Sequence, residues 1–398
     1  MEQTAKYILL QNDYSLSYNE SDCFVNNKSS KKEGETKPPK EICYELQKTF
    51  YNTFLKRHFR NLVIFSSAGT SRDNGNEKTN GKTRLELWDY CKAEIDAFTE
   101  TLADIKAKTF YTDKDIEALL SYIILNEKLN GEIKNKDNKS LKEALELKIA
   151  EACTLELQPQ APHIDFLNKV TARKPSDPRV QLFTTNYDLL FEKAANQGGF
   201  IVIDGFSFTQ PRRFSGRYFD FDIVNREKTR IKQEESFVSK VFYLHKLHGS
   251  LNWHKDKNGN IELQDNPAKP LIIYPANEKY ESSYEQPYFE MMSRFQQALR
   301  KENTLLIVIG FGFQDKHIQN AIIEAVEQNP SFQLLIINYN DTEGIDSTLI
   351  KPFFVDESKM LVKRNVNIIF DTFSGFTKNY PSNSTYIEPS KEIGNESI

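Results

Sequence analysis

Seven short apolar runs, almost uninterrupted by polar residues, recur along the chain and predict the strands of one sheet. Runs of this kind are typical of parallel strands that helices bury on both faces. Polar or helix-patterned segments separate them, so the pattern predicts an α/β fold with a doubly wound parallel sheet. The predicted strands are 62–65, 180–183, 200–203, 241–244, 305–309, 334–337 and 366–370.

Helical spacing of apolar residues marks three further stretches. Residues 41–58 are expected to form a helix that leads into the first strand. Asp315 is a candidate N-cap for a helix that continues through Val326. Between about 84 and 155 the helical spacing continues without a strand, interrupted by Asn- and Lys-rich turns at 130–139. We therefore expect a helical insertion, or cap, over the sheet.

The two ends of the chain are more polar than its middle. A short apolar start within residues 1–20 precedes an Asn- and Ser-rich stretch, and the charged run 28–40 predicts a flexible loop. These shifts divide the chain into an N-terminal extension with its lead-in helix, a sheet domain and a C-terminal tail. The predicted boundaries are 1–59, 60–375 with the insertion 84–155, and 376–398.

The charge balance argues against an autonomous nucleic-acid-binding protein. The chain has 52 Lys and Arg against 56 Asp and Glu, so it lacks the strongly basic field of such proteins. Arg212, Arg213 and Arg217, interleaved with Phe214 and Tyr218, form one basic and aromatic stretch. This stretch fits either a solvated loop or a local nucleic-acid contact, and its role stays open.

The cysteines predict neither a zinc ribbon nor another metal site. Cys23, Cys43, Cys91 and Cys153 lie at least twenty residues apart, with no CxxC pair. We find no secretory leader and no apolar stretch approaching the roughly 18 residues of a membrane span. The expectation is a soluble, cytoplasmic protein in a reducing compartment, without membrane association.

Small and polar residues directly follow four of the predicted strands. Because the carboxyl ends of parallel strands meet at one edge of a sheet, we expect these residues to form one site. Each segment alone has an ordinary structural explanation, as a turn or a helix cap, so the prediction depends on their coincidence. The four segments are Ser66–Ser71, Thr184–Asp188, Leu247–Ser250 and Gly310–Phe313.

Two of these segments suit close approach of the backbone to a phosphate. The first contains only small residues, although Gly69 is its one glycine, so the dehydrogenase pattern GxGxxG is missing. Gly310 and Gly312 predict a second close approach after another strand. Asn338 ends the next strand, where an amide would meet a ribose or an adenine.

The other two segments carry candidate catalytic groups. Asn186 is suited to hold a water or a sugar hydroxyl, whereas Asp188 is a candidate helix cap or ligand. His248 is placed to accept a proton from a ribose hydroxyl. A metal site of His245, His248 and His254 is disfavoured, because alternation along a strand sends His245 and His248 to opposite faces.

These motifs resemble those of the sirtuin-like NAD-binding proteins, especially the bacterial antiphage-defence branch that hydrolyses NAD. The resemblance covers roughly residues 60–80 and 178–340. Ser67 replaces the first glycine of the family's GAG-type loop, and Gly312 lies in the family's Gly-x-Ser loop, from which the serine is absent. The matching positions are Ser67, Ala68, Gly69, Thr70 and Ser71, then Thr184, Asn186 and Asp188, then His248 and Gly249, then Gly310 and Gly312, and finally Asn338.

The resemblance implies a Rossmann-like sheet that takes NAD as its substrate and hydrolyses the nicotinamide–ribose bond. Asn186 and His248 would be catalytic, and the other matching positions would bind NAD. Without CxxC pairs a protein deacylase is doubtful, and a module that senses NAD or ADP-ribose without cleavage remains an alternative. A nuclease subunit ranks last.

The resemblance also implies that assembly or a partner gates the activity. Family members occur as homo-oligomers or beside a HerA-like hexameric ATPase. No Walker A motif is present in this sequence, so an ATPase activity would have to come from another chain.

Overall fold

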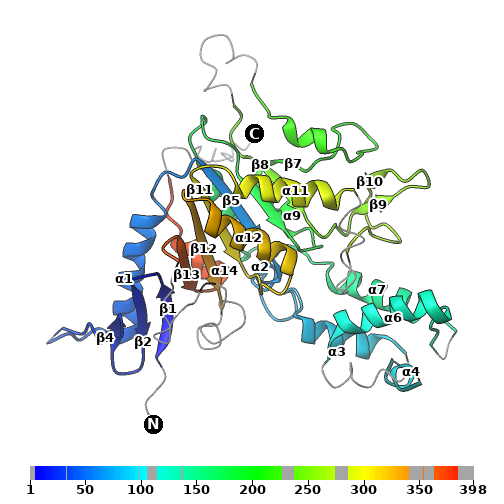
Figure 1. Cartoon of the computed structure of the whole chain (residues 1–398), viewed down its shortest axis with the longest axis horizontal. Helices are drawn as coiled ribbons and strands as arrows, with labels where there is room; N and C mark the ends of the chain where they lie inside the picture. The colour runs from blue at the N-terminus through cyan, green and yellow to red at the C-terminus, as the bar shows by residue number, and fades with distance from the viewer. Residues whose placement is uncertain are drawn as a thin grey trace, which may run out of the picture.

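Eleven strands form one sheet in the part of the chain that the computed structural model describes (Figure 1). The order is β4-β3-β2-β1-β13-β12-β11-β5-β6-β8-β7. The described residues are 5–32, 34–96, 98–104, 114–135, 138–225, 237–273, 286–339, 353 and 363–383. The expected α/β fold with a large, mostly parallel sheet is therefore confirmed.

The parallel part of the sheet consists of the seven strands predicted from the apolar runs. From β5 the chain builds toward β6, β8 and β7, then crosses back to place β11 on the other side of β5. The winding thus reverses between β5 and β11, and ligands of doubly wound sheets bind at such a point. The strands are β5 (Asn61–Ser66), β6 (Gln181–Thr184), β7 (Ile201–Ile203), β8 (Val241–Lys246), β11 (Thr304–Ile309), β12 (Phe332–Asn338) and β13 (Val366–Phe370).

An antiparallel meander at the N-terminus extends the sheet beyond β13, where the sequence predicted a short apolar start and a loop. Its first strand pairs with β13 through Leu9 and Ile369. The pattern was missed because these strands are short and the second one buries the hydroxyls of Ser15 and Ser17. The strands are β1 (Lys6–Leu10), β2 (Ser15–Tyr18), β3 (Cys23–Val25) and β4 (Lys28–Ser29).

A disulfide joins Cys23 of β3 to Cys43 of α1 (Pro39–Phe54). The meander folds back onto this helix, so two cysteines twenty residues apart in sequence come to a Cα separation of 5.9 Å. Disulfides are rare in reducing compartments. The pairing was not expected from the cysteine spacing, and the expected compartment stays a prediction.

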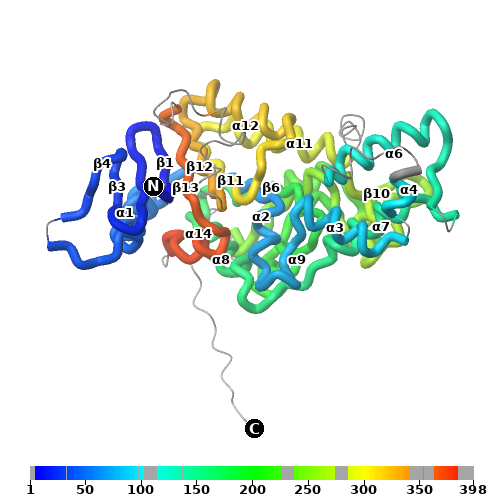
Figure 2. Tube along the Cα trace, turned by 90° about the horizontal axis from the view of Figure 1, so that it is seen from below, coloured from blue at the N-terminus to red at the C-terminus, as the bar shows by residue number. Residues whose placement is uncertain are grey.

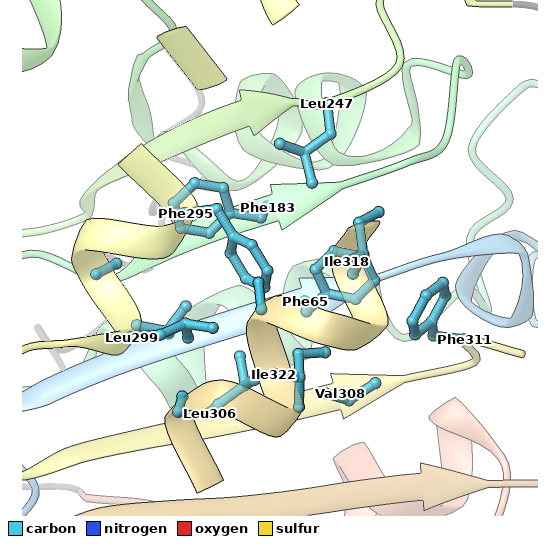
Figure 3. Close-up of a cluster of buried hydrophobic side chains, with 14 of the residues drawn as sticks. Phe65, Phe183, Leu247, Phe295, Leu299, Leu306, Val308, Phe311, Ile318 and Ile322 are labelled. Atoms are coloured by element: carbon cyan, nitrogen blue, oxygen red, sulfur yellow. The ribbon is translucent and has the colours of Figure 1, made fainter. Parts of the chain in front are cut away.

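Helices cover both faces of the sheet, as alternation along the strands requires. Ile64 and Ile307 point to the core under α1, α8 (His163–Thr171), α9 (Leu190–Gly198) and α14 (Phe373–Asn379). Phe65 and Val308 point to the opposite core under α11 (Tyr288–Leu299) and α12 (Lys316–Gln328). Figure 3 shows this second core, where Phe295 of α11 packs on Phe65 with the ring centroids 5.4 Å apart.

The segment for which we expected a helical insertion forms a third, separate core. Trp88, Leu119 and Leu145 are among its buried residues. These helices lie at the opposite end of the molecule from the N-terminal meander (Figure 2). The domain boundaries themselves stay a prediction. The helices are α3 (Arg84–Glu94), α4 (Phe98–Asp104), α6 (Ile116–Asn130) and α7 (Leu141–Ala152).

Four smaller elements complete the described chain, one of which is the 3₁₀-helix η1 (Gly216–Asp220). A hairpin of β9 (Trp253–Lys255) and β10 (Ile261–Leu263) follows β8, and the short helix α2 (Ala68–Ser71) follows β5. None of the described helices has the length and apolarity needed to cross a membrane. Most of the predicted tail, residues 384–398, lies outside the described residues.

Candidate functional site

A cavity of about 540 Å³ lies at the carboxyl ends of the parallel strands, between the sheet and the insertion. Loops after β5, β6, β8 and β11 line one side of it, which is the convergence expected from the sequence. The lining from these loops comprises Ser67, Ala68, Ser71, Thr185, Asn186, Tyr187, Asp188, His248, Gly310, Phe311, Gly312, Gln314 and Asp315.

The loops after β5 and β11 touch each other across the point where the winding reverses. The backbone N–H of Gly69 donates to the carbonyl of Gly310 at 3.1 Å. A Cβ on either glycine would clash with the backbone of the other, and Gly310 has a φ of +65°. Both glycines are therefore required for loop packing.

Most backbone donors of the first loop are already used within the protein. The N–H of Ser67 donates to the carbonyl of Ile309, and the N–H of Thr70 donates to the carbonyl of Ser67. With the bond from Gly69, three N–H groups of this loop are engaged, and of the two expected to hold a pyrophosphate, at Ala68 and Gly69, that of Gly69 is among them. The structure thus favours a packing role for Gly69 and leaves Ala68 and Ser71 as the lining residues of α2.

Hydrogen bonds fix the orientation of the Asn186 side chain. Its Nδ2 donates to the carbonyl of Ser67 at 3.0 Å, to Oγ1 of Thr70 at 3.0 Å and to Oγ of Ser71 at 2.8 Å. The carbonyl can only accept, so the nitrogen must be the atom on this side. Oδ1 then lies on the other side of the amide, where it can only accept a hydrogen bond.

Asp188 is tied to the protein through both carboxylate oxygens. Oδ2 accepts from Oγ of Ser71 at 2.6 Å, and Oδ1 accepts from the N–H of Leu190 at the start of α9. Lys246, which is 3% exposed, donates to the backbone carbonyl of Asp188 and to Oε1 of Glu192. These contacts give Asp188 a structural role just before α9, although Leu189 and not Asp188 is the N-cap of that helix.

His248 faces a carboxylate that the sequence did not connect with it. Its Nε2 lies 3.2 Å from Oδ2 of Asp315, and the two side chains are 13% and 11% exposed. The sequence predicted Asp315 only as the N-cap of α12, which it also is, since Oδ1 accepts from the N–H of His317. Pairing between the end of β8 and the start of α12 has no local signal in the sequence.

The remaining predicted site residues lie beside the cavity rather than in its lining. Thr184 and Thr70 are buried behind Asn186, and the Oγ1 of Thr184 accepts from the backbone N–H of Asn186. Gly249 turns the chain at a φ of +86° against Leu271. Asn338 ends β12 and is not among the lining residues.

The insertion and residues 81–83 just before it supply the opposite wall of the cavity, and the sequence analysis named none of these residues as part of the site. Lys82 and Arg84 bring two cationic side chains to this wall, and Arg84 also lies 3.4 Å from Oδ2 of Asp115. Burial raises the pKa of the Cys153 thiol to about 12, so this thiol stays protonated at neutral pH. The lining residues on this wall are Gly81, Lys82, Thr83, Arg84, Leu87, Ile116, Glu117, Ala152, Cys153 and Leu155.

The three histidines near β8 do not converge. His245 is buried between the rings of Phe183 and Phe219, and its Nε2 lies 2.7 Å from Oε1 of Gln181. Burial moves the pKa of His245 well below its ordinary value. Among the described residues, no group of three or more His, Cys, Asp or Glu side chains gathers into a possible metal site.

The basic and aromatic stretch is held by acidic partners. Arg212 pairs with Asp204 at 2.7 Å, and Arg213 pairs with Glu262 at 2.8 Å. Arg217 lies over the ring of Tyr218. These contacts give each arginine a structural role within its own region and favour the loop interpretation.

Comparison with known proteins matches part of the region that forms the cavity. Residues 180–352 match the family model described as the SIR2-like domain, a span that includes the loops of Asn186, His248 and Gly310. No curated protein matches the sequence significantly. One solved chain, from work on the structural basis for the mechanism and regulation of Sir2 enzymes, aligns with a TM-score of 0.42 and 12% identity, covering 84% of this chain and 94% of that one. The part of the chain that carries Asn186, His248 and Gly310 is thus similar to SIR2-like domains.

Proposed function

We propose that the protein hydrolyses NAD at the bond between nicotinamide and ribose, giving nicotinamide and ADP-ribose. The observation that carries this proposal is the meeting of Asn186 and His248, from two different strand ends, in the lining of one cavity. The match of residues 180–352 to the SIR2-like domain supports NAD as the substrate class.

The chemistry needs little more than these two side chains and a water. Nicotinamide carries a positive charge in NAD, so it leaves with the bonding electron pair as a neutral molecule. Water adds to C1′ of the ribose, and its proton passes to His248. Asn186 holds the water or a ribose hydroxyl through Oδ1, which stabilises the oxocarbenium-like centre by position and dipole.

Two cationic side chains on the wall opposite α2 also have a role in this proposal. The pyrophosphate of NAD is anionic, and Lys82 and Arg84 are the cationic residues in the cavity lining. In this proposal they attract the pyrophosphate from the wall opposite α2.

The decisive experiment incubates the purified chain with NAD and quantifies nicotinamide and ADP-ribose by chromatography. Asn186→Ala and His248→Ala should lose product, whereas the controls Asn196→Ala and His254→Ala, outside the lining, should keep it. NAD binding by calorimetry without any product would replace hydrolysis with sensing. Release of an acyl group from an acyl-lysine peptide would instead favour a deacylase.

A role in antiviral defence belongs to the same proposal and rests on the resemblance of the residue motifs. Unregulated cleavage of NAD would deplete the host, so activity in this proposal is gated by homo-oligomer assembly or by a HerA-like hexameric ATPase. The assay above is therefore run with and without a candidate ATPase encoded beside the gene. Stimulation by the ATPase would support the gate, and equal activity in both samples would remove it.

A further inference from the structure

The last residue of β8, Lys246, buries an ammonium group inside the fold. Lys246 pairs with Thr184 at the end of the β6–β8 register, and it lies on the same face of the strand as Leu244, toward the core under α9. The residue is only 3% exposed. Lysine is almost never buried to this degree unless its charge is paired and its donors are bonded.

Each of the three hydrogen atoms of this ammonium group has an acceptor. Nζ of Lys246 donates to the backbone carbonyl of Tyr187 at 3.3 Å, to the backbone carbonyl of Asp188, and to Oε1 of Glu192 at 2.9 Å. Two of these acceptors belong to the turn between β6 and α9. Lys246 therefore ties the end of β8 to the turn that follows β6.

The two residues with proposed catalytic roles lie directly beside this tie. Asn186 immediately precedes the turn that Lys246 holds, and His248 follows Lys246 by two positions. The turn is also linked to the Asn186 side chain, because Oγ of Ser71 donates to Oδ2 of Asp188 and accepts from Nδ2 of Asn186. The contacts of Lys246 thus connect the two segments that carry the proposed catalytic groups.

Stability alone does not explain a cation at this position. The N-terminus of a helix carries a partial positive charge, so the helix dipole opposes a lysine that reaches Glu192 in the first turn of α9. Burial of the charge also costs free energy, and a well-packed apolar side chain is often as stable as a buried ion pair. Residues that break such local preferences are expected at functional sites.

We propose that Lys246 is a positioning residue, which holds the turn after β6 so that Asn186 keeps its orientation at the cavity. Lys246 is not among the residues that line the cavity, so it acts through the turn and not on the substrate. A misplacement of about 1 Å at a reacting group can cost about 100-fold in rate. The catalytic consequence rests on the proposed hydrolysis of NAD, whereas the hold on the turn does not.

Two substitutions separate the hold on the turn from the ion pair. Lys246→Met removes all three hydrogen bonds and replaces the lysine by an unbranched side chain that adapts to the space. The Glu192 side chain is 28% exposed, so water can solvate its carboxylate in this variant. Glu192→Gln is the matched control, because it removes the counter-charge but leaves Lys246 bonded to both backbone carbonyls.

We expect Lys246→Met to lower kcat for NAD cleavage by at least about tenfold, with KM changed by less than about threefold, because a displaced Asn186 stabilises the transition state less. Glu192→Gln should keep kcat within about threefold. It should nevertheless unfold at a lower urea concentration, since the buried ammonium group has lost its counter-charge.

Two results of this comparison would overturn the proposal. One is a Lys246→Met protein that keeps more than about a third of the wild-type kcat. The other is an equal loss of kcat in Glu192→Gln, which would make the ion pair responsible. Should the methionine variant not fold, Lys246→Gln replaces it. Its amide is uncharged and one atom shorter, so kcat should still fall by at least about fivefold, and an unchanged kcat would count against the proposal in the same way.

A measurement without NAD tests the hold on the turn. The full chain is labelled with ¹⁵N-asparagine, and the side-chain NH₂ signal of Asn186 is assigned by comparison with Asn186→Ala. We expect this group to exchange slowly with water in the wild type and in Glu192→Gln, because Nδ2 is hydrogen-bonded within the protein. Exchange should be faster in Lys246→Met. An unchanged exchange rate would overturn the proposal whether or not NAD is cleaved.

The two readouts keep the two proposals apart. If exchange responds as expected but the wild type cleaves no NAD, the hold of Lys246 on the turn stands and hydrolysis fails. If the wild type cleaves NAD and neither kcat nor exchange responds to Lys246→Met, hydrolysis stands and Lys246 has no positioning role.

Discussion

A single hydroxyl group joins the two polar side chains that follow β6. Oγ of Ser71 donates to Asp188 and accepts from Nδ2 of Asn186. Because the carboxylate can only accept, it sets the direction of the hydroxyl, and the hydroxyl in turn helps to set the direction of the amide. Asp188, itself part of the cavity lining, therefore also influences the orientation of Asn186 through Ser71.

Replacing Ser71 by alanine should weaken both stability and activity. The change removes one acceptor from Asn186 and leaves Oδ2 of buried Asp188 without this donor, so we expect a loss of about 1–3 kcal/mol in the free energy of unfolding. NAD cleavage should also fall. Urea unfolding and product chromatography measure the two effects, with Ser293→Ala on α11 as the control. Unchanged stability would show that this network carries no net free energy.

His163 on α8 makes stability depend on pH. It is fully buried, edge-on to Phe191 and Phe373, and burial lowers its pKa to about 3. The unfolded chain takes up a proton near pH 6.5 but the folded chain does not, so stability is lost as pH falls below about 6.5 toward 3.

The comparison is His163→Phe, which fills the same site without a titrating group. Between pH 7 and pH 5 the wild type should lose about 2 kcal/mol more unfolding free energy than the variant. Asp371, whose pKa burial raises to about 6, acts in the opposite direction but equally in both proteins. Urea unfolding at the two pH values gives the result, and parallel losses would contradict the buried-neutral assignment.

At the scale of elements, the contact between the loops after β5 and β11 leaves no room for a side chain. Gly69→Ala would press a methyl group into the backbone of Gly310, and we expect a loss of about 1–3 kcal/mol or more together with a distorted cavity. Gly312→Ala, two residues further on, meets nothing closer than 3.9 Å and should be nearly neutral. Thermal unfolding of the pair tests this, and equal melting temperatures would be inconsistent with the close packing.

The elements that could be predicted were those whose pattern is complete within their own residues. The strands of the parallel sheet are continuous apolar runs. The helix α12 was predicted from its N-cap, Asp315, and from the apolar residues at helical spacing that follow. The N-terminal strands were missed because each is only a few residues long; β1 pairs with β13, and β2, β3 and β4 are added to it one after another. Tertiary pairing of this kind overrides local propensity.

The same holds for the site: features that follow from a local pattern or from the sheet topology were predictable, and contacts between distant loops were not. Convergence of strand ends follows from the topology of any parallel sheet, so Asn186 and His248 were placed together in advance. The partner of His248 and the engaged N–H groups of the loop after β5 were not, because both depend on contacts between loops distant in sequence. The position of Lys82 and Arg84 in the cavity lining was missed for the same reason. The spacing of apolar residues in a helix does not tell which part of the insertion faces the sheet.

At the scale of the whole molecule, the cavity is shared between the sheet and the insertion. Lys82→Ala should raise KM for NAD while kcat changes little. The lysine charge would attract the pyrophosphate equally in the ground state and in the transition state, so its loss weakens binding without raising the barrier of the chemical step. Initial rates over a range of NAD concentrations measure this, with Lys92→Ala on α3 as the control outside the cavity lining. A fall in kcat at constant KM would place Lys82 in the chemical step instead.

The pairing of β5 with β11 has a consequence for how the protein is made. Asn61, at the start of β5, bonds to a residue 241 positions later in the chain. A nascent chain that has not yet released the segment through Asp315 from the ribosome lacks one wall of the cavity and the carboxylate beside His248. Synthesis itself therefore delays completion of the site until this segment has emerged.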